Sequence, residues 1–329
     1  MRTCTEFNIV FVLMRTRFRQ SCALSLLLLL FAVLTECSAA KPTGLSALLQ
    51  LQKYTKISHD TYYLSRKRHP HNPAKYVHGY AFLNLHSSTL TNSPSANTIR
   101  RDKHNHFQRN LTTHESAKSH LHEKKLYANL PSCTGPIAEG ASWKNSRGFY
   151  IHTQNRNGLT TAFIIDAIQK ANDAWHCGTS EYEKLVEGPL LGVVDSSSGA
   201  SIDVNSPDGT NQIGFASIEG HPGTVAVTIV WGIFDGPIFQ RAIIEYDMIF
   251  DGDHFSFGDG GKNKNVMDLQ AIATHETGHS YGLDDIYDPS CIDVTMFGTE
   301  SEGRTEKRSV EQRDLDGLSL LYGPLAPNK

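Results

Sequence analysis

The run from His275 to Asp285 (His-Glu-Thr-Gly-His-Ser-Tyr-Gly-Leu-Asp-Asp) constrains this chain more than any other stretch. On a helix of about 3.6 residues per turn, His275 and His279 lie one turn apart on the same face, where two imidazoles can bind one Zn²⁺. Glu276, the next residue, is then placed to act as a general base toward water. The spacing therefore predicts a metal-binding helix that carries its own base.

A glycine and an acid complete this pattern. Gly282 is expected to end the helix sharply, because glycine adopts a positive φ without steric cost. The chain can then fold back and present Asp285 as the third zinc ligand, with Asp284 as the alternative. Three protein ligands leave a fourth position for water, which distinguishes a catalytic zinc site from a structural one. A helix with stacked surface histidines and no metal is the competing interpretation.

The extended pattern H-E-x-x-H-x-x-G-x-x-D resembles the metzincin clan of zinc endopeptidases, and other segments narrow the resemblance to matrixin-like members. Met296 lies where that family has its Met-turn beneath the zinc, although a simple core methionine is the alternative. The C-terminal run 307–323 resembles the closing helix of the family and ends in Leu-Tyr-Gly. Asp285 replaces the third histidine of vertebrate matrixins, and of the family's Asp-Asp-Ile segment only the second acid, Asp314, is present.

The resemblance covers about residues 143 to 323 and implies an α+β fold. This fold has a twisted mixed β-sheet, an active-site helix, a backing helix and a small C-terminal subdomain with a closing helix. It also implies a zinc-dependent endopeptidase that hydrolyses peptide bonds in proteins, with an edge strand beside the cleft. Residues 224–231 are the candidate for that edge strand, and an ordinary core strand is the alternative.

Two other function classes remain. One is a secreted metal-binding or adhesive protein with a degenerate protease domain, although the intact Glu276 argues against it. The other is a zincin of a different clan, which the identity of the third ligand would reveal.

Residues 1–40 have the organisation of a secretory signal peptide. Arginines at positions 15, 17 and 19 precede an apolar core from Cys22 to Leu34, and the small residues Ser38, Ala39 and Ala40 follow. The apolar run is shorter than the ~20 residues that a transmembrane helix needs. We therefore expect a secreted, extracellular protein with no membrane anchor after signal cleavage; a signal anchor is the alternative.

Charge divides the rest of the chain into two parts. Residues 41–132 carry 14 Lys and Arg against 4 Asp and Glu (14 − 4 = +10), whereas residues 133–329 carry 13 against 28 (13 − 28 = −15). Ten of the 16 histidines also lie in the basic part. Residues 41–139 are interpreted as a basic, His-rich and largely disordered prosegment or linker, because little periodic apolar content is present from Asn84 to Lys125. Asn110 is a candidate glycosylation site there.

The basic part could also be a nucleic-acid or heparin-binding arm. We expect no nucleic-acid partner, because no interleaved aromatic residues or folded binding module accompany the charge. Since the basic segment should dock on the acidic domain, the protein is predicted to be a zymogen.

The acidic part is long enough for one catalytic domain, residues 140–324, followed by a tail at 325–329. The apolar spacing predicts a helix at 161–176. Asp268 is expected to cap the start of the metal-binding helix, and Ser309 with Gln312 forms a capping-box pattern at the start of the last helix. Strands are expected at 148–153, 190–194, 212–218, 224–231 and 241–250. Strands mixed with a few helices indicate an α+β domain, which we expect to be a monomer.

Three acids in a glycine-rich loop, Asp251, Asp253 and Asp259, could hold a structural Ca²⁺. They lack the spacing of an EF-hand, so a solvated acidic loop is the alternative.

The cysteines suggest how latency could arise. Removal of the signal peptide leaves Cys133, Cys177 and Cys291, of which two should pair in an oxidising compartment. By resemblance to matrixin prosegments, Cys133 is a candidate cysteine switch whose thiolate would bind the zinc. The alternative is a Cys133–Cys177 disulfide with Cys291 free.

Overall fold

The computed structural model describes residues 55–56, 60–91, 133–136, 140–145, 148–176, 190–194, 202–218, 221 and 223–323. The predicted signal peptide 1–40, the tail 325–329, Asn110 and Cys177 lie outside this described part. Among the residues it covers, no helix is both long and apolar enough to cross a membrane.

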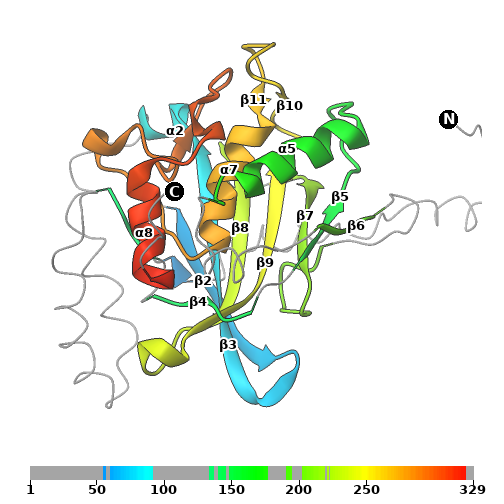
Figure 1. Ribbon diagram of the computed structural model, residues 1–329. Helices are drawn as coiled ribbons and strands as arrows, with labels where there is room; N and C mark the ends of the chain where they lie inside the picture. Colours follow the sequence, from blue (N-terminus) through cyan, green and yellow to red (C-terminus); the bar gives the residue numbers. More distant parts are fainter. Residues whose placement is uncertain are drawn as a thin grey trace, which may run out of the picture. The chain divides into compact units, whose positions relative to one another are not determined.

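A single large sheet organises the fold, with strand order β1-β2-β3-β8-β9-β7-β5-β6 (Figure 1). Strands β5, β6, β7 and β9 run parallel to one another, whereas β8 is antiparallel to both β9 and β3. The short strands β4 and β12 pair in parallel with β9 and β3. The strand bounds are β1 Thr55–Lys56, β2 Thr61–His69, β3 Asn72–His86, β4 Ser142–Trp143, β5 Phe149–His152, β6 Leu190–Val194, β7 Asn211–Ala216, β8 Thr224–Ile233, β9 Ala242–Asp251 and β12 Thr299–Glu300.

Two helices, α5 (Thr161–Asp173) and α7 (Leu269–Ser280), lie together against one face of this sheet (Figure 1). A small parallel pair, β10 (Phe257–Gly258) and β11 (Met267–Asp268), leads directly into α7. The last helix, α8 (Gln312–Tyr322), closes the C-terminal part, and the short α2 (Ser88–Thr91) follows β3. A mixed sheet with few helices confirms the predicted α+β fold class.

The sheet has a hydrophobic core on each face. The core on the helix side contains Trp175 of the α5 region, Ile272 of α7 and Met248 of β9, all almost fully buried. The opposite face is built mainly from strands and includes Leu83, Ile229 and Trp231. Burial of large apolar side chains on both faces contributes about 1.5–3 kcal/mol for each side chain, so the central strands are the most firmly held elements.

The helix caps agree with the sequence at α7 and differ at α8. Asp268 caps α7, because its side chain accepts a hydrogen bond from the Ala271 backbone N–H. At α8, the capping pair is Glu311 with Asp314 rather than Ser309 with Gln312. The predicted pair is wrong because the Ser309 hydroxyl already donates to the Glu306 carbonyl of the preceding 3₁₀ turn.

The largest difference from the sequence analysis concerns residues 61–86. Interpreted from the sequence as part of a largely disordered prosegment, this segment instead forms the hairpin β2–β3, which extends the large sheet. An isolated two-stranded hairpin is only marginally stable in water, but against β8 the side chains of β3 become buried on both faces. A domain boundary at residue 140 therefore does not describe this sheet.

The same pairing changes the position of the strand at 224–231. It was the candidate edge strand, but β8 lies inside the sheet, with β9 on one side and β3 on the other. Residues 224–231 therefore form a core strand, which was the alternative to the predicted edge strand.

Candidate metal centre

Helix α7 and the turn after it bring the candidate ligands together. His275 and His279 project from one face of α7, and Gly282, with φ of 101°, ends the helix and turns the chain back. The ligand atoms of His275, His279 and Asp285 all lie within 4.8 Å of one another. The exposed fractions of these three residues are only 0%, 0% and 3%, so the group is shielded from solvent.

Backbone carbonyls fix the orientation of both imidazole rings. His275 Nδ1 lies 2.8 Å from the Thr295 carbonyl oxygen, and His279 Nδ1 lies 2.9 Å from the Leu283 carbonyl oxygen. A carbonyl oxygen can only accept, so each Nδ1 carries the proton and each Nε2 keeps its lone pair. Burial, followed by the charges of Lys307 and His279, holds the pKa of His275 well below its usual range, which favours the neutral ligand form.

Both lone pairs face the carboxylate of Asp285. His275 Nε2 lies 3.1 Å from Asp285 Oδ1, and His279 Nε2 lies 3.6 Å from Asp285 Oδ2. Two acceptors and a buried anion repel one another unless a cation or a shared proton lies between them. Two nitrogens and one oxygen match the donor set of catalytic zinc, so the residues fit that metal. Asp284 stays outside the group, and its Oδ1 instead accepts from the Asp285 backbone N–H at 2.9 Å.

Glu276 is fully buried beside this group. The hydroxyl of Thr228, on β8, donates to Glu276 Oε2 and so fixes the carboxylate against the sheet. Burial raises the pKa of Glu276 to about 8, and the Thr228 hydroxyl, the Asn84 side chain and the Lys307 ammonium oppose that rise. A carboxylate whose pKa lies near neutrality can both accept and return a proton.

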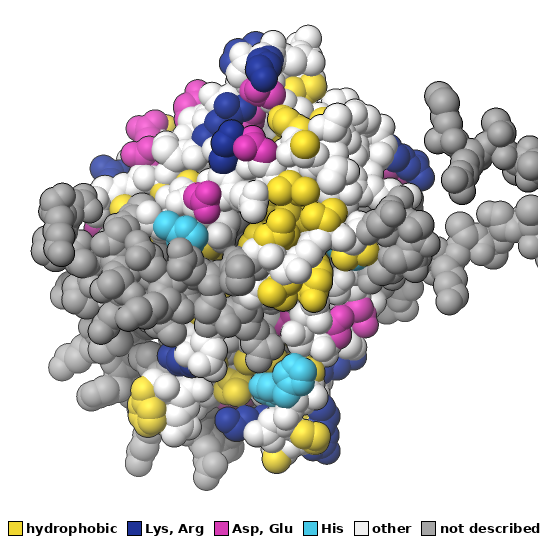
Figure 2. Space-filling view, turned by 45° about the vertical axis from the view of Figure 1, so that its right-hand side comes forward, with side chains coloured by type: hydrophobic (Ala, Val, Ile, Leu, Met, Phe, Trp, Pro, Cys, Tyr) yellow, Lys and Arg dark blue, Asp and Glu magenta, His cyan; other side chains and the backbone are white. Residues whose placement is uncertain are grey.

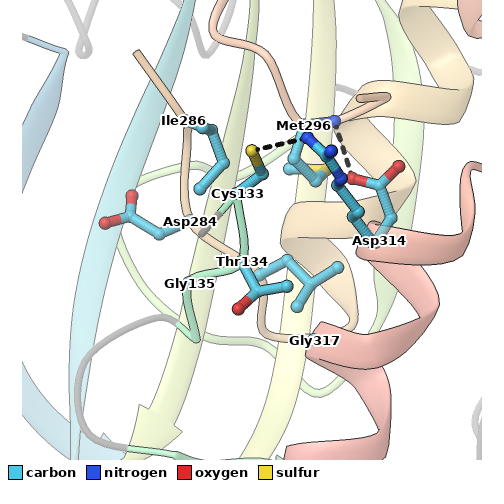
Figure 3. A pocket seen from close by; sticks show the side chains of 10 residues that line it. Cys133, Thr134, Gly135, Asp284, Ile286, Met296, Asp314 and Gly317 are labelled. Atoms are coloured by element: carbon cyan, nitrogen blue, oxygen red, sulfur yellow. Dashed lines mark hydrogen bonds between the residues drawn. The ribbon is translucent and has the colours of Figure 1, made fainter. Parts of the chain in front are cut away.

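The predicted Met-turn lies beneath α7. Met296 is 2% exposed, and its sulfur packs so close to Gly278 that a Cβ there would come within 2.2 Å of it. The carboxylate of Asp314 holds this turn from α8, accepting from the backbone N–H of Thr295 at 2.9 Å and of Met296 at 3.1 Å (Figure 3). The surviving acid of the closing helix thus supports the floor of the site.

A disulfide joins Cys133 to Cys291 across a sequence separation of 158 residues. Both predictions for Cys133 are therefore wrong: its sulfur is not available to a metal, and its partner is not Cys177. The bond fixes the segment 133–136 beside the Met-turn, where it lines a narrow crevice together with Arg313 and Gly317 (Figure 3). Arg313 Nη1 lies 3.0 Å from the Cys133 sulfur, and the Gly135 carbonyl accepts from the Asp284 N–H at 2.8 Å.

The three loop acids considered for calcium each contact a basic side chain. Asp251 binds His254 at 2.8 Å, Asp253 lies 3.2 Å from Arg156, and Asp259 lies 2.6 Å from Arg308. Calcium binding therefore remains a prediction of the sequence alone.

Several residues around the centre were not identified from the sequence. Thr228 lies in a predicted strand, but nothing in its pattern indicated a bond to Glu276. Phe82 stacks on His279, with ring centroids 4.9 Å apart and 19° between the planes, and Asn84 lies beside Glu276. The nearly continuous run of apolar and aromatic residues from Tyr76 to Leu85 is the signal that could have revealed this strand.

Comparison with known proteins agrees with this geometry. The family description Matrixin matches residues 142–323. Metalloendoproteinase 1 of Glycine max is 35% identical over 98 residues, which make up 27% of this chain and 31% of that protein. The chain thus spans about a third of the length of that curated relative. A solved structure, metalloproteinase-II from Bacteroides fragilis, is 11% identical, with a TM-score of 0.29 over 80% of this chain and 77% of the other.

The similarity to the Bacteroides fragilis structure is too weak to assign a fold or a function. The aligned region of the Glycine max relative covers too little of either chain to assign an activity. The family match is different, because it spans more than half of the chain and includes α7, Asp285, the Met-turn and α8. Matrixins carry a catalytic zinc and act on peptides or proteins, which agrees with the observed His/His/Asp group. The chain therefore belongs to the matrixin family, which supports a zinc metalloprotease.

Proposed function

We propose that this protein is a secreted zinc-dependent endopeptidase that is made as a zymogen and hydrolyses peptide bonds in proteins. The observation that carries the proposal is the convergence of His275, His279 and Asp285 around one point, with Glu276 on the same helix. The family membership and the predicted signal peptide support the substrate class and the extracellular location.

In this proposal His275, His279 and Asp285 hold the zinc. When bound, the metal would lower the pKa of a coordinated water and polarise the scissile carbonyl. Glu276 would accept a proton from the attacking water and return it to the leaving amine. Thr228 would keep the Glu276 carboxylate in place, and the carbonyls of Thr295 and Leu283 would keep both imidazole rings aimed at the metal.

The test is the variant Glu276→Ala in the full chain. Wild type and variant would be loaded with zinc, treated with limiting trypsin to cleave the basic segment, and assayed on a mixture of fluorogenic peptides. The variant should retain zinc and lose about 10²–10⁴-fold in turnover, because the ligands remain and the base is gone. Wild type depleted of zinc by a chelator serves as the control.

Near wild-type turnover by Glu276→Ala would show that this carboxylate is not the base. A wild-type protein that binds zinc and yet cleaves no peptide after trypsin treatment would instead favour the metal-binding, non-enzymatic alternative.

A further inference from the structure

Strand β3 lies between β8 and β12 and passes beside the candidate metal centre. On one side it pairs antiparallel with β8, from His78 opposite Gly232 to Leu85 opposite Thr224. On the other side its last two residues, Leu85 and His86, pair in parallel with β12, which follows the Met-turn. Addition of an extended strand to the edge of a sheet is one of the ways in which proteins bind a peptide.

One face of β3 points toward α7. Phe82, which is 1% exposed, stacks on the ring of His279, and in the strand register it is opposite Thr228. Asn84, two residues further on, is fully buried beside Glu276. Alternate residues of β3 therefore contact a proposed ligand and the proposed base, without any of them joining the three-residue metal group.

The other face of β3 holds the strand in place. Leu83 and Leu85 share a core with Val227 and Ile229 of β8, which makes the apolar pairing continuous across the two strands. Gly79 lies directly under the Trp231 ring, where a Cβ would come within 2.6 Å of the ring. Only glycine allows this close approach, so Gly79 is specific to the docked position of the hairpin.

Polar contacts fix both ends of the pairing. His78 Nε2 donates to Asp235 Oδ2 at 2.8 Å, and His86 Nε2 donates to Glu302 Oε2 at 3.0 Å. Arg66 and Arg68 of β2 stack on the Tyr76 ring within the hairpin. Figure 2 shows Lys and Arg side chains gathered at the lower end of the view, where the hairpin turns in Figure 1. Attachment of the hairpin thus combines strand pairing and apolar packing with these two polar contacts at its ends.

We propose that the hairpin β2–β3 is an internal inhibitor that occupies the peptide-binding groove between β8 and β12 as a substrate-like strand. This inference rests on the proposed peptidase function. Latency then requires no thiolate on the metal, because β3 itself covers His279 and Glu276 and uses the edge of β8 that a substrate would need. The enzyme becomes competent when the hairpin leaves the groove.

The experiment uses the full chain with a recognition site for a specific protease inserted between Ala96 and Asn97. Cleavage there separates the hairpin from the remainder of the chain. The zinc-loaded protein would be compared uncut, cut, and cut with the hairpin fragment removed by size-exclusion chromatography. The measurements are peptide hydrolysis and the rate at which dipicolinate, a zinc chelator, removes the metal. A scrambled site treated with the same protease is the control.

Removal of the fragment should raise turnover by about 10- to 1,000-fold, the reciprocal of an open state populated at about 0.1–10%. Zinc removal should accelerate in the same protein, because the ligands are no longer covered. A synthetic peptide with the sequence of residues 60–88 should restore inhibition and compete with substrate.

A point variant tests the same idea without cleavage. Gly79→Val should loosen β3, because the added side chain meets the Trp231 ring, and should accelerate both hydrolysis and zinc removal. Ala74→Val, at an exposed position of the same strand, should change neither. Thermal unfolding of both variants shows whether the catalytic part stays folded.

The outcomes separate the two proposals. Faster zinc removal without peptide hydrolysis would support the covering strand and contradict the peptidase function. Equal hydrolysis and equal zinc removal in the uncut and separated forms would overturn the inhibitory role. Loss of near-UV circular dichroism on separation would also overturn it, because β3 would then be a permanent strand of the fold.

Discussion

At the scale of single residues, the third ligand is the position that most distinguishes this centre. Zn²⁺ with two neutral imidazoles and a carboxylate carries one positive charge fewer than Zn²⁺ with three imidazoles. Asp285, the proposed third ligand, is buried, whereas its neighbour Asp284 is half-buried and accepts a hydrogen bond from the Asp285 backbone N–H through Oδ1. Asp284 and Asp285 therefore have different environments, and their substitutions should affect zinc affinity differently.

Asp285→Ala should lower zinc affinity by about 100-fold or more, since loss of a direct ligand costs at least as much as loss of a residue that only orients one. Asp284→Ala should leave zinc affinity within a few-fold of wild type. Competition with a fluorescent zinc indicator measures both variants. The opposite ranking would show that Asp284 is the ligand.

At the scale of elements, α7 is a helix without a solvent face. All residues from Leu269 to Ser280 except Gln270 are buried, because the sheet lies on one side and α5 and the Met-turn lie on others. Such a helix cannot be recognised from amphipathic periodicity. It is held by close packing, and Gly278 is its tightest point, facing the Met296 sulfur and the Trp175 ring.

Gly278→Ala should therefore destabilise the protein by about 1–3 kcal/mol, although alanine is the better helix former at an unhindered position. The added methyl would meet the Met296 sulfur at 2.2 Å and the Trp175 ring at 2.8 Å. Thermal unfolding of the zinc-free protein measures the change independently of metal binding.

The matched variant for that test is Gly317→Ala in α8. Its Cβ would meet the end of the flexible Leu283 side chain at 3.0 Å, so a smaller loss is expected. Gly278→Ala as stable as wild type would show that the Met-turn can move away from α7 at little cost.

The helices and strands that could be predicted from the sequence are those whose patterns lie within a few neighbouring residues. The metal helix, its Asp268 cap, its Gly282 stop and five strands of the sheet all have patterns within a few residues. The hairpin β2–β3 could not be placed in the same way, because its stability comes from β8, more than a hundred residues away. The Cys133–Cys291 pair is also non-local, and cysteine counting alone leaves three pairings open among three thiols.

At the scale of the whole molecule, one covalent link joins distant parts of the described chain. The Cys133–Cys291 disulfide ties the segment that precedes β4 to the C-terminal part, next to α8. Every residue of β5 to β9 and α7 lies within the loop that it closes. Reduction of the bond should thus affect the stability of the whole catalytic part.

The double variant Cys133→Ser with Cys291→Ser should lower the free energy of unfolding by about 2–4 kcal/mol, because the unfolded chain is no longer constrained by a long loop. Urea unfolding under oxidising conditions measures this difference. Cys177→Ser, which leaves the bond intact, is the reference. An unchanged unfolding midpoint in the double variant would mean that the bond contributes nothing to stability.

His86 and Glu302, which contact each other in the folded chain, are 216 positions apart in the sequence. The ribosome therefore makes the second residue well after the first. At about 5–20 residues per second, a ribosome makes Glu302 about 10 to 40 seconds after His86. The hairpin exists without its neighbour β8 until Ile233 has been made and without β12 until Glu300 has been made, and an isolated two-stranded hairpin is only marginally stable in water. Strand β3 is thus made early and completes its pairing late, so each newly made molecule covers its candidate metal centre as a late event of folding.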